Sequence, residues 1–272
     1  MSLPAAIPKF WRNASLPFIE AREIEDGRHV CYARHAHETF SIGAITGGES
    51  VYLNGAHADS VRAGSIVVIN PGAVHACNPI KDHPWSYLMF YVDPVWLGRR
   101  QQAAGWKNDG EFQSFATLSS TDAFLFDGLR HLYATLIDTR MRVEQKARSA
   151  EAFFTDLART LKPTRSSDKP AHAQLESAAR YIRENCSQSI RLKHICAVAG
   201  LSESHLIRSF KTRYGMTPHA YQVNCRIEYS RAQLKRGSAI ADVAIDAGFA
   251  DQAHLQRVFK QLTAATPGQY QG

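Results

Sequence analysis

The sequence predicts an α+β protein with two domains: an N-terminal β-barrel with flanking helices, and an all-α C-terminal domain with two helix-turn-helix units joined by a linker helix. Between residues 28 and 92, short apolar runs are separated by Gly, Asn and Pro, a pattern typical of many closely spaced strands. After Asp122 the apolar residues follow helical spacing. Near the C-terminus one segment occurs twice, which indicates a duplicated supersecondary unit.

These observations divide the chain into four parts. They are a small β-barrel or sandwich over residues 1–118, a helical hairpin over 119–161, a linker over 162–170 and the duplicated domain over 171–272. Within the first part, the strands are predicted from the apolar runs 40–45, 51–53, 64–69 and 87–92. Gly47-Gly48 and Asn54-Gly55 predict turns between them, and at Asn54-Gly55 both central residues of a hairpin tolerate positive φ.

The second part is predicted to be two antiparallel helices. Leu125, Leu129, Leu132 and Leu136 follow helical spacing, and a second stripe runs from Ala147 to Leu161. These stripes either cover the barrel or form the seam of a dimer. Residues 162–170 then combine two prolines with polar side chains, which is typical of a linker.

The repeat is the most specific feature of the chain. Residues 202–218 return forty-nine residues later as 251–267, with His, Leu, Arg, Phe, Lys, Thr and Pro in register. Before the first copy, Gly200 is expected to close a short helix in the left-handed conformation. Ser202 and Asp251 are expected to cap the helices that follow, each through its side chain. The second copy departs from the first at its end, where Ala264 stands in place of Gly215.

Each repeated helix is predicted to bury one stripe and expose the opposite one. Leu206 and Phe210 face inward in the first copy, as do Leu255 and Phe259 in the second. In a helix-turn-helix unit the second helix enters the major groove, where Arg reads guanine and Gln reads adenine. The outward residues at or beside this face are the predicted DNA contacts: Ser204, His205, Ile207, Arg208, Lys211, Gln252, Ala253, Gln256, Arg257 and Lys260.

Charge and cysteine content fit this interpretation. Residues 171–272 hold thirteen Lys and Arg against seven Asp and Glu, a net charge of +6, whereas residues 1–170 hold nineteen against eighteen. A basic C-terminal part beside a nearly neutral remainder indicates a module that binds a polyanion. The five cysteines are scattered and form no CxxC pair, so reduced thiols in the cytoplasm are expected. No leader or membrane span is predicted, and no membrane partner is expected.

On these residues the C-terminal domain resembles the DNA-binding domain of the AraC/XylS family of transcription regulators. The matching features are Leu201-Ser-Glu-Ser-His-Leu-Ile-Arg-Ser-Phe-Lys211, Tyr214-Gly-Met-Thr-Pro218 and Ala247-Gly-Phe249. The resemblance implies two helix-turn-helix units on one side of promoter DNA, with RNA polymerase as a further partner. It assigns base reading to Ser204, Ile207 and Arg208 in the first copy, and to Ala253, Gln256 and Arg257 in the second.

The N-terminal part contains a histidine pattern that resembles the cupin barrel of many AraC/XylS regulators. His35 and His37 are two apart on an expected strand, so both point to one face, and His75 follows Asn-Pro-Gly at a turn. The resemblance implies a sensor for a small-molecule effector, and the expected ligand contacts are His35, His37, Glu38, Tyr52, His75 and Trp85. His35, His37 and His75 also suit a divalent metal, although Glu38 lies beside His37 and faces the other way in a regular strand.

The sequence therefore predicts a ligand-responsive transcription regulator that acts as a homodimer, requires no cofactor and is not an enzyme. Two alternatives remain open. One is a metal-dependent cupin enzyme with a DNA-binding tail, which a bound metal and turnover would distinguish. The other is a dimeric regulator that responds to no effector.

Overall fold

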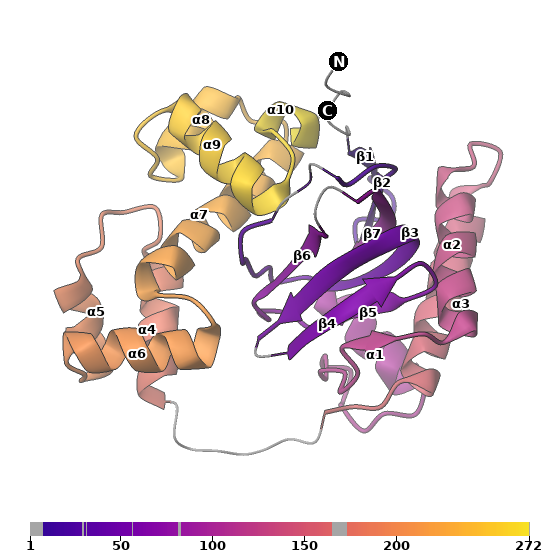
Figure 1. Cartoon of the computed structure of the whole chain (residues 1–272), viewed down its shortest axis with the longest axis horizontal. Helices are drawn as coiled ribbons and strands as arrows, with labels where there is room; N and C mark the ends of the chain where they lie inside the picture. Colours follow the sequence, from indigo (N-terminus) through magenta and orange to yellow (C-terminus); the bar gives the residue numbers. More distant parts are fainter. Residues whose placement is uncertain are drawn as a thin grey trace. The chain divides into compact units, whose positions relative to one another are not determined.

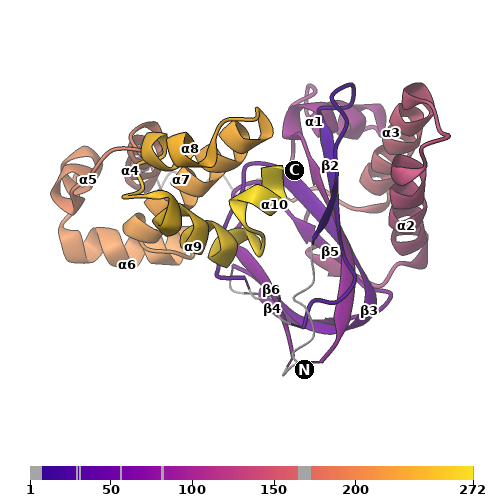
Figure 2. The ribbon, with the colours of Figure 1, turned by 90° about the horizontal axis from the view of Figure 1, so that it is seen from above.

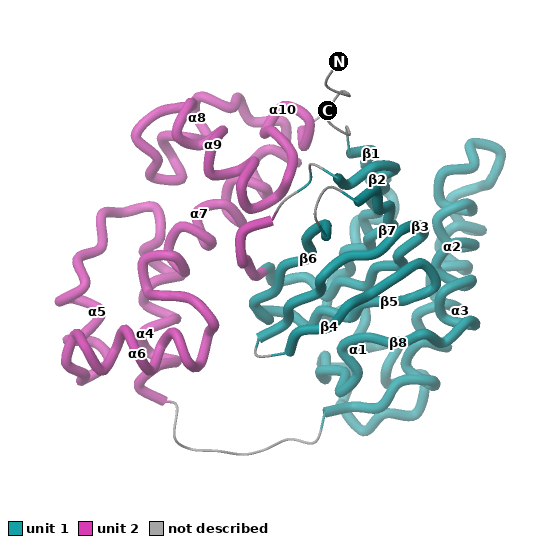
Figure 3. The backbone as a smooth tube through the Cα atoms, viewed as in Figure 1, with its two compact units in different colours: residues 1–31, 37–166 teal, residues 32–36, 167–272 magenta. Residues whose placement is uncertain are grey.

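The computed structural model describes residues 8–28, 30, 32–55, 57–80, 83–164 and 173–271. The chain forms two compact units (Figure 3). Unit 1 comprises residues 1–31 and 37–166, and unit 2 comprises residues 32–36 and 167–272. The predicted division into a β-rich N-terminal part and a helical C-terminal part is confirmed, apart from the short segment 32–36 that is grouped with unit 2.

Unit 1 is built on one antiparallel sheet of eight strands, ordered β1-β2-β7-β3-β5-β8, with β4 and β6 paired to the far half of β3. Its strands are β1 Lys9–Trp11, β2 Ile19–Ile24, β3 Phe40–Asn54, β4 His57–Arg62, β5 Ile66–Ile69, β6 His75–Pro79, β7 Trp85–Val92 and β8 Ser119–Ser120. The long strand β3 pairs with β5 and β7 through its first half and with β4 and β6 through its second half. The sheet therefore folds over along β3, as Figures 1 and 2 show.

The structure corrects the prediction of a turn at Gly47-Gly48. The strand continues through both glycines, with a register shift between Ile45 and Gly47, so the two predicted runs are one bulged strand. Gly48 has φ +68, and a Cβ there would lie 1.9 Å from the Pro84 carbonyl oxygen. The prediction of a hairpin turn at Asn54-Gly55 is only partly correct. Gly55 has φ +59 at the hairpin turn, whereas Asn54 is the last residue of β3 and pairs with His57.

Three helices belong to unit 1: α1 Pro94–Ala103, α2 Ala123–Ile137 and α3 Val143–Thr160. The pair α2 and α3 lies along one face of the sheet in both views (Figures 1 and 2). Leu129 and Leu136 of α2 and Phe154 of α3 are fully buried in one core with the sheet residues Ile42 and Phe90. The predicted apolar stripes therefore cover the sheet, and a dimer seam would have to use other surface.

The predicted linker begins later than expected. The Ala116 amide donates to the Lys162 carbonyl at 2.9 Å and the Thr164 amide to the Ser114 carbonyl at 2.7 Å. Residues 162–164 are thus attached to unit 1. The rest of the predicted linker lies outside the described residues, as does Cys31. Cys77, Cys186, Cys196 and Cys225 are free thiols, and no described helix is long and apolar enough to cross a membrane.

Unit 2 is entirely helical apart from its connections (Figure 1). Its helices are α4 Ala173–Glu184, α5 Leu192–Ala199, α6 Glu203–Tyr214, α7 Pro218–Lys235, α8 Ile240–Asp246, α9 Gln252–Thr263 and α10 Pro267–Gln271. The pairs α5–α6 and α8–α9 are the two predicted helix-turn-helix units, and α7 is the predicted linker helix between them. Gly200 ends α5 with φ 63 and ψ 35, as expected for a left-handed helix end.

The two copies differ at both ends of their second helices. Asp251 caps α9 by accepting a hydrogen bond from the His254 amide at 2.6 Å, as predicted. Ser202 occupies the same position before α6, but its hydroxyl makes no capping hydrogen bond, so that prediction is wrong. At the other end, Gly215 has φ 70, and Ala264 adopts the same left-handed conformation with φ 52 in spite of its Cβ.

The segment 32–36 is bound to the rest of unit 2 by hydrogen bonds to its main chain. The buried Asn224 side chain of α7 accepts from the Ala36 amide at 2.9 Å and donates to the Ala36 carbonyl at 2.8 Å. The Ala33 amide donates to the Gln261 carbonyl at the end of α9 at 3.0 Å. An asparagine that satisfies both groups of one peptide residue holds that residue in a defined orientation.

Candidate functional site

The second helices of the two helix-turn-helix units, α6 and α9, each bury one stripe and expose the other. Leu206 and Phe210 of α6 are fully buried, as are Leu255 and Phe259 of α9. The ten residues predicted to contact DNA are all exposed: Ser204, His205, Ile207, Arg208, Lys211, Gln252, Ala253, Gln256, Arg257 and Lys260. The sequence thus predicted correctly which face of each helix is available to a partner.

Arg208 and Arg257 occupy equivalent positions in the two copies and are exposed on their helices. Within the described part of the chain, neither guanidinium is engaged in an ion pair or hydrogen bond. Arg231 of α7 differs, since it is paired with Glu228 at 2.9 Å and is bonded to the Tyr270 hydroxyl. Because a guanidinium offers five donors in a planar fork, Arg208 and Arg257 are each able to bind a guanine edge or a phosphate.

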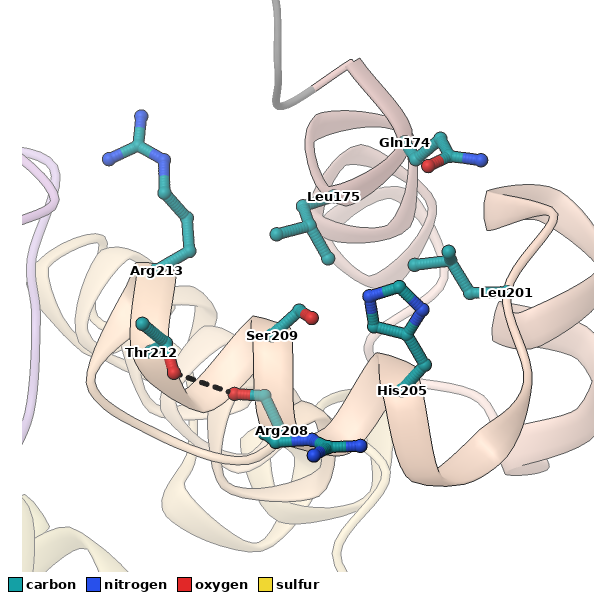
Figure 4. A pocket seen from close by; sticks show the side chains of 8 residues that line it. All are labelled: Gln174, Leu175, Leu201, His205, Arg208, Ser209, Thr212 and Arg213. Carbon is teal, nitrogen blue, oxygen red and sulfur yellow. Dashed lines mark hydrogen bonds between the residues drawn. The ribbon is translucent and has the colours of Figure 1, made fainter.

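A hollow of about 570 Å³ lies between α4 and α6, beside the exposed stripe of α6 (Figure 4). Gln174 and Leu175 contribute its α4 wall. The rest of its lining is Leu201 and the α6 residues His205, Arg208, Ser209, Thr212 and Arg213. With Arg208 and Arg213 at one helix wall, the surface next to the predicted contact residues is cationic, which favours an anionic partner such as nucleic acid.

In unit 1, His37 and His75 form a buried pair. Their side chains are almost fully buried, and their rings meet edge to face with centroids 4.8 Å apart. The His37 Nδ1 atom lies 2.9 Å from the Thr39 carbonyl oxygen, and the His75 Nδ1 atom lies 2.9 Å from the Ala73 carbonyl oxygen. Because a carbonyl only accepts hydrogen bonds, each Nδ1 atom carries a proton in this arrangement.

The strands place further polar residues on the face of the sheet opposite the helices. Ser41 of β3 pairs with Tyr91 of β7, which pairs with Glu20 of β2, so the three side chains form one row across the sheet. The Ser41 hydroxyl is 3.3 Å from His37 Nε2, and the Tyr91 and His37 ring centroids are 5.5 Å apart. Reasoning from the sequence missed Ser41 and Tyr91 as site residues, because strand register is not visible in the sequence alone.

Tyr52 of β3 is connected to this polar group through β6. It is fully buried and pairs with Cys77, while Asn54 pairs with His75. The Tyr52 hydroxyl donates to the Val68 carbonyl at 2.8 Å and accepts from the Asn54 amide at 2.6 Å. Burial raises the pKa of Tyr52, so the hydroxyl remains a donor at neutral pH. These two hydrogen bonds fix the Tyr52 side chain on β3, two residues before Asn54, the strand partner of His75.

The other predicted ligand contacts in unit 1 do not belong to this group. Glu38 is exposed. Trp85 donates to the Gly27 carbonyl at 2.7 Å and stacks on Tyr87. Since Trp85 and Tyr91 are six residues apart on β7, roughly 20 Å of strand separates them. The prediction that Glu38 and Trp85 contact the ligand together with the histidines is therefore not supported by their positions.

The prediction that His35 and His37 share a face of a regular strand is wrong. Strand β3 begins only at Phe40, and neither histidine lies within a strand. The orientation of His37 comes from its contacts with Thr39 and Ser41 rather than from strand alternation. His35 belongs to segment 32–36 of unit 2, where its Nδ1 lies 2.9 Å from the Ala33 carbonyl. Unit 1 by itself therefore supplies two of the three imidazoles of the predicted metal set, and unit 2 holds the third.

Together, two helix-turn-helix units with exposed basic residues and a separate β-sheet unit with a polar interior define a DNA-binding regulator with a ligand-binding domain. Comparison with known protein families agrees. Residues 19–161 match the family described as AraC-like ligand binding domain, and residues 195–272 match a helix-turn-helix domain. The chain belongs to the AraC family of transcription regulators, which bind DNA and respond to small-molecule effectors.

Individual relatives agree with this assignment, and solved structures share the fold. An uncharacterized HTH-type transcriptional regulator of Bacillus subtilis, YbfI, is 24% identical over 229 residues, covering 82% of this chain and 81% of its own. A Staphylococcus aureus regulator is 23% identical over 85% of this chain, but the chain spans only 31% of its length. The crystal structure of an apo ToxT variant from Vibrio cholerae has a TM-score of 0.60 at 12% identity, covering 97% of this chain and 96% of ToxT. Wild-type ToxT bound to an unsaturated fatty acid gives 0.57 at 14% identity, covering 93% and 94%.

Proposed function

We propose that this regulator reads two neighbouring segments of promoter DNA with α6 and α9, and that a small polar effector bound beside His37 and His75 changes its occupancy of that promoter. The observation that supports DNA reading most strongly is the matched pair of exposed, unengaged guanidinium groups at Arg208 and Arg257 among the described residues. Both occur at the same place in the repeat, where the resemblance to AraC/XylS proteins assigns base reading.

Alanine variants of the two arginines test DNA reading. A DNA sequence is first selected from a random duplex library with the full chain, and affinities are then measured at one fixed salt concentration. Arg208→Ala and Arg257→Ala should each lower specific affinity by about 1–3 kcal/mol and relax the base preference at one position of the site. An equal loss on every sequence would assign that arginine to phosphate instead.

For the effector we propose a small polar molecule. The imidazoles of His37 and His75 lie side by side, and Ser41 and Tyr91 add hydroxyl groups beside them on the same face of the sheet. ToxT has been crystallised with an unsaturated fatty acid, but the polar groups here argue for a less hydrophobic molecule. Amino acids and organic acids are the first candidates.

A thermal-shift screen of the full chain tests this proposal. A compound that raises the melting temperature of the native chain should lose its effect on His75→Ala, while the affinity of that variant for the selected DNA without effector stays unchanged. Tyr229, exposed on α7, provides the matched control through Tyr229→Ala, which should keep the full response. An unchanged dose response in His75→Ala would remove the histidine pair from the effector site.

A divalent metal at the histidine pair is the second candidate. Metal-bound histidines usually donate their other ring N–H to a carbonyl or carboxylate, and both Nδ1 atoms have such a contact. Metal analysis of the purified chain distinguishes the two. Stoichiometric metal that is lost in His75→Ala would assign a metal site, and turnover of a substrate would assign an enzyme. We infer that the chain is not an enzyme, because its relatives are transcription regulators.

We further propose a homodimer that acts on promoter DNA in the cytoplasm and also contacts RNA polymerase. Since the apolar stripes of α2 and α3 are buried against the sheet, the dimer contact would use outward residues such as Phe124 and Ile137, which are 61% and 47% exposed. Phe124→Glu should weaken a dimer measured by analytical ultracentrifugation. A dimer that survives this change would place the contact elsewhere.

A further inference from the structure

Three segments of unit 2 that are distant in sequence meet at Arg226 of α7. They are the loop 185–191, which leads into the first helix-turn-helix unit, the helix α7, and the turn 247–251 between the two helices of the second unit. The Arg226 guanidinium donates from Nε to the Cys186 carbonyl at 2.7 Å and from Nη2 to the Gln188 carbonyl at 2.9 Å. From Nη1 it donates to the Gly248 carbonyl at 2.6 Å.

A neighbouring side chain on α7 reinforces the first half of this arrangement. Gln222 lies one turn before Arg226 on the same helix face, and its amide nitrogen donates to the Cys186 carbonyl at 3.1 Å and to the Gln188 carbonyl at 2.8 Å. Gln222 is 6% exposed. The loop 185–191 is therefore bound to α7 by two side chains, and Arg226 alone of these two also reaches the turn of the second unit.

The loop 185–191 and the turn of the second helix-turn-helix unit also touch directly beside Arg226. Gly248 has φ +80, and a Cβ there would lie 2.0 Å from the Ser187 carbonyl oxygen and 3.2 Å from the Arg226 Cζ atom. Only glycine fits this close approach of two backbones. The Arg226 guanidinium also lies near the ring of the buried Phe249, with Cζ 5.9 Å from its centroid. This packing limits sliding of the second unit past the loop that leads into the first unit.

We propose that Arg226 is a positioning residue that fixes the separation and orientation of the recognition helices α6 and α9, and so determines which spacing of two half-sites the protein reads. This inference rests on the proposed reading of DNA by both helices. Two helices that enter successive major-groove segments must match the helical repeat of about 34 Å. The helix α7 joins the two units through a short connection at each of its ends. Arg226 adds a second link, because it binds the loop 185–191 and the turn 247–251 at the same time. Its hydrogen bonds are charge-assisted and therefore stronger than neutral ones.

The experiment compares spacing preference in the full chain. A bipartite DNA site is selected with the native protein, and affinities are measured for that site, for the same site with two base pairs inserted between its halves, and for each half alone. The native chain should lose about tenfold or more on the inserted site. The affinity of Arg226→Gln for the selected site should be about tenfold lower than that of the native chain. Its affinities for the two spacings should differ by less than about threefold. Its affinity for each isolated half should be almost that of the native chain.

Two further variants and a control complete the test. Gly248→Ala should produce the same loss of spacing preference, because its Cβ would separate the turn from the Ser187 carbonyl. Arg226→Lys keeps the charge but has one donor centre, so its spacing preference should be intermediate. This variant replaces Arg226→Gln in the test if circular dichroism shows that Arg226→Gln does not fold. Arg236→Gln removes a charge at the exposed end of α7 and should lower all affinities by a similar factor. An Arg226→Gln protein that keeps the native spacing ratio, or weakens isolated halves equally, overturns the inference. Failure of the native chain to select any bipartite site would refute the proposed function instead.

Discussion

Exchanging the residues at the ends of the two recognition helices should change stability in opposite directions. Gly215 and Ala264 follow α6 and α9 at equivalent positions, and both are left-handed, with φ 70 and φ 52. For a residue with a Cβ this conformation costs roughly 1–2 kcal/mol, while glycine loses about 0.4–1 kcal/mol through the greater entropy of its unfolded chain. Ala264→Gly should therefore raise the free energy of unfolding by about 0.5–1 kcal/mol, and Gly215→Ala should lower it by a similar amount.

Urea unfolding of the full chain measures both effects. All four tryptophans, Trp11, Trp85, Trp96 and Trp106, lie in unit 1, so their fluorescence follows that unit, whereas circular dichroism at 222 nm also follows the helices of unit 2. The midpoint by circular dichroism should move in each variant, while the fluorescence midpoint stays constant. Destabilisation by Ala264→Gly, or tolerance of Gly215→Ala, would show that the left-handed backbone does not control stability at these helix ends.

Two further predictions concern a helix cap and a buried thiol. Asp251→Ala should lower the free energy of unfolding by about 1 kcal/mol, because it removes the hydrogen bond to the His254 amide. Ser202→Ala should lower it by less than about 0.5 kcal/mol, because the Ser202 hydroxyl makes no capping hydrogen bond. Equal losses in urea unfolding would contradict the assignment of the caps. Burial raises the pKa of Cys77 from 9.0 to about 11. Between these two pH values only the thiol of the unfolded chain ionises, so the contribution of Cys77 to stability is fully present below pH 9 and is lost as the pH rises towards 11. Cys77→Ala should flatten the pH dependence of unfolding between these limits, and an unchanged slope would exclude the thiol as its source.

The sequence predicted unit 2 more completely than unit 1, and the reason is physical. The helices of unit 2 depend on local spacing, and glycines such as Gly200 mark their ends, so a single segment contains the information needed. Strand β2 was missed because it is almost entirely buried and carries Glu20 and Arg22 among its buried residues, which hides the alternation that identifies a strand. Helix α1 was missed for a related reason, since its buried residues include Gly98 and Gln101.

The candidate sites follow the same division. The DNA-facing residues lie on single helices, where a rotation of about 100° per residue fixes which side chains share a face. The polar group of unit 1 depends on the pairing of β2, β7 and β3, which places Glu20, Tyr91 and Ser41 in one row. Such pairings join residues far apart in sequence, and neither composition nor spacing specifies them. The sequence predicted His35, His37 and His75 as one set, with His35 and His37 on a regular strand. The structure places the His37 and His75 rings side by side in unit 1, and neither His35 nor His37 lies within a strand.

The unequal ends of the two recognition helices imply that their reading halves differ in rigidity. The first amides of a helix have no acceptor within it. In α9 the His254 amide is bound by Asp251, but the equivalent His205 amide in α6 has no such acceptor from Ser202. A cap worth about 1 kcal/mol corresponds to about fivefold in a local opening equilibrium. Amide hydrogen exchange in the free chain should therefore be about fivefold faster at His205 than at His254, after correction for intrinsic rates.

DNA binding should reduce that difference, because phosphate oxygens accept from amides at helix N-termini. The first turn of α6 then gains an acceptor that the first turn of α9 already has in the free chain. Ser202→Asp should produce the same protection of His205 without DNA, and Asp251→Ala should make His254 exchange as His205 does. Equal exchange at the two histidine amides in the free chain would show that the cap does not control the rigidity of the first turns of α6 and α9. A change in the first turn of α6 on DNA would then have another cause.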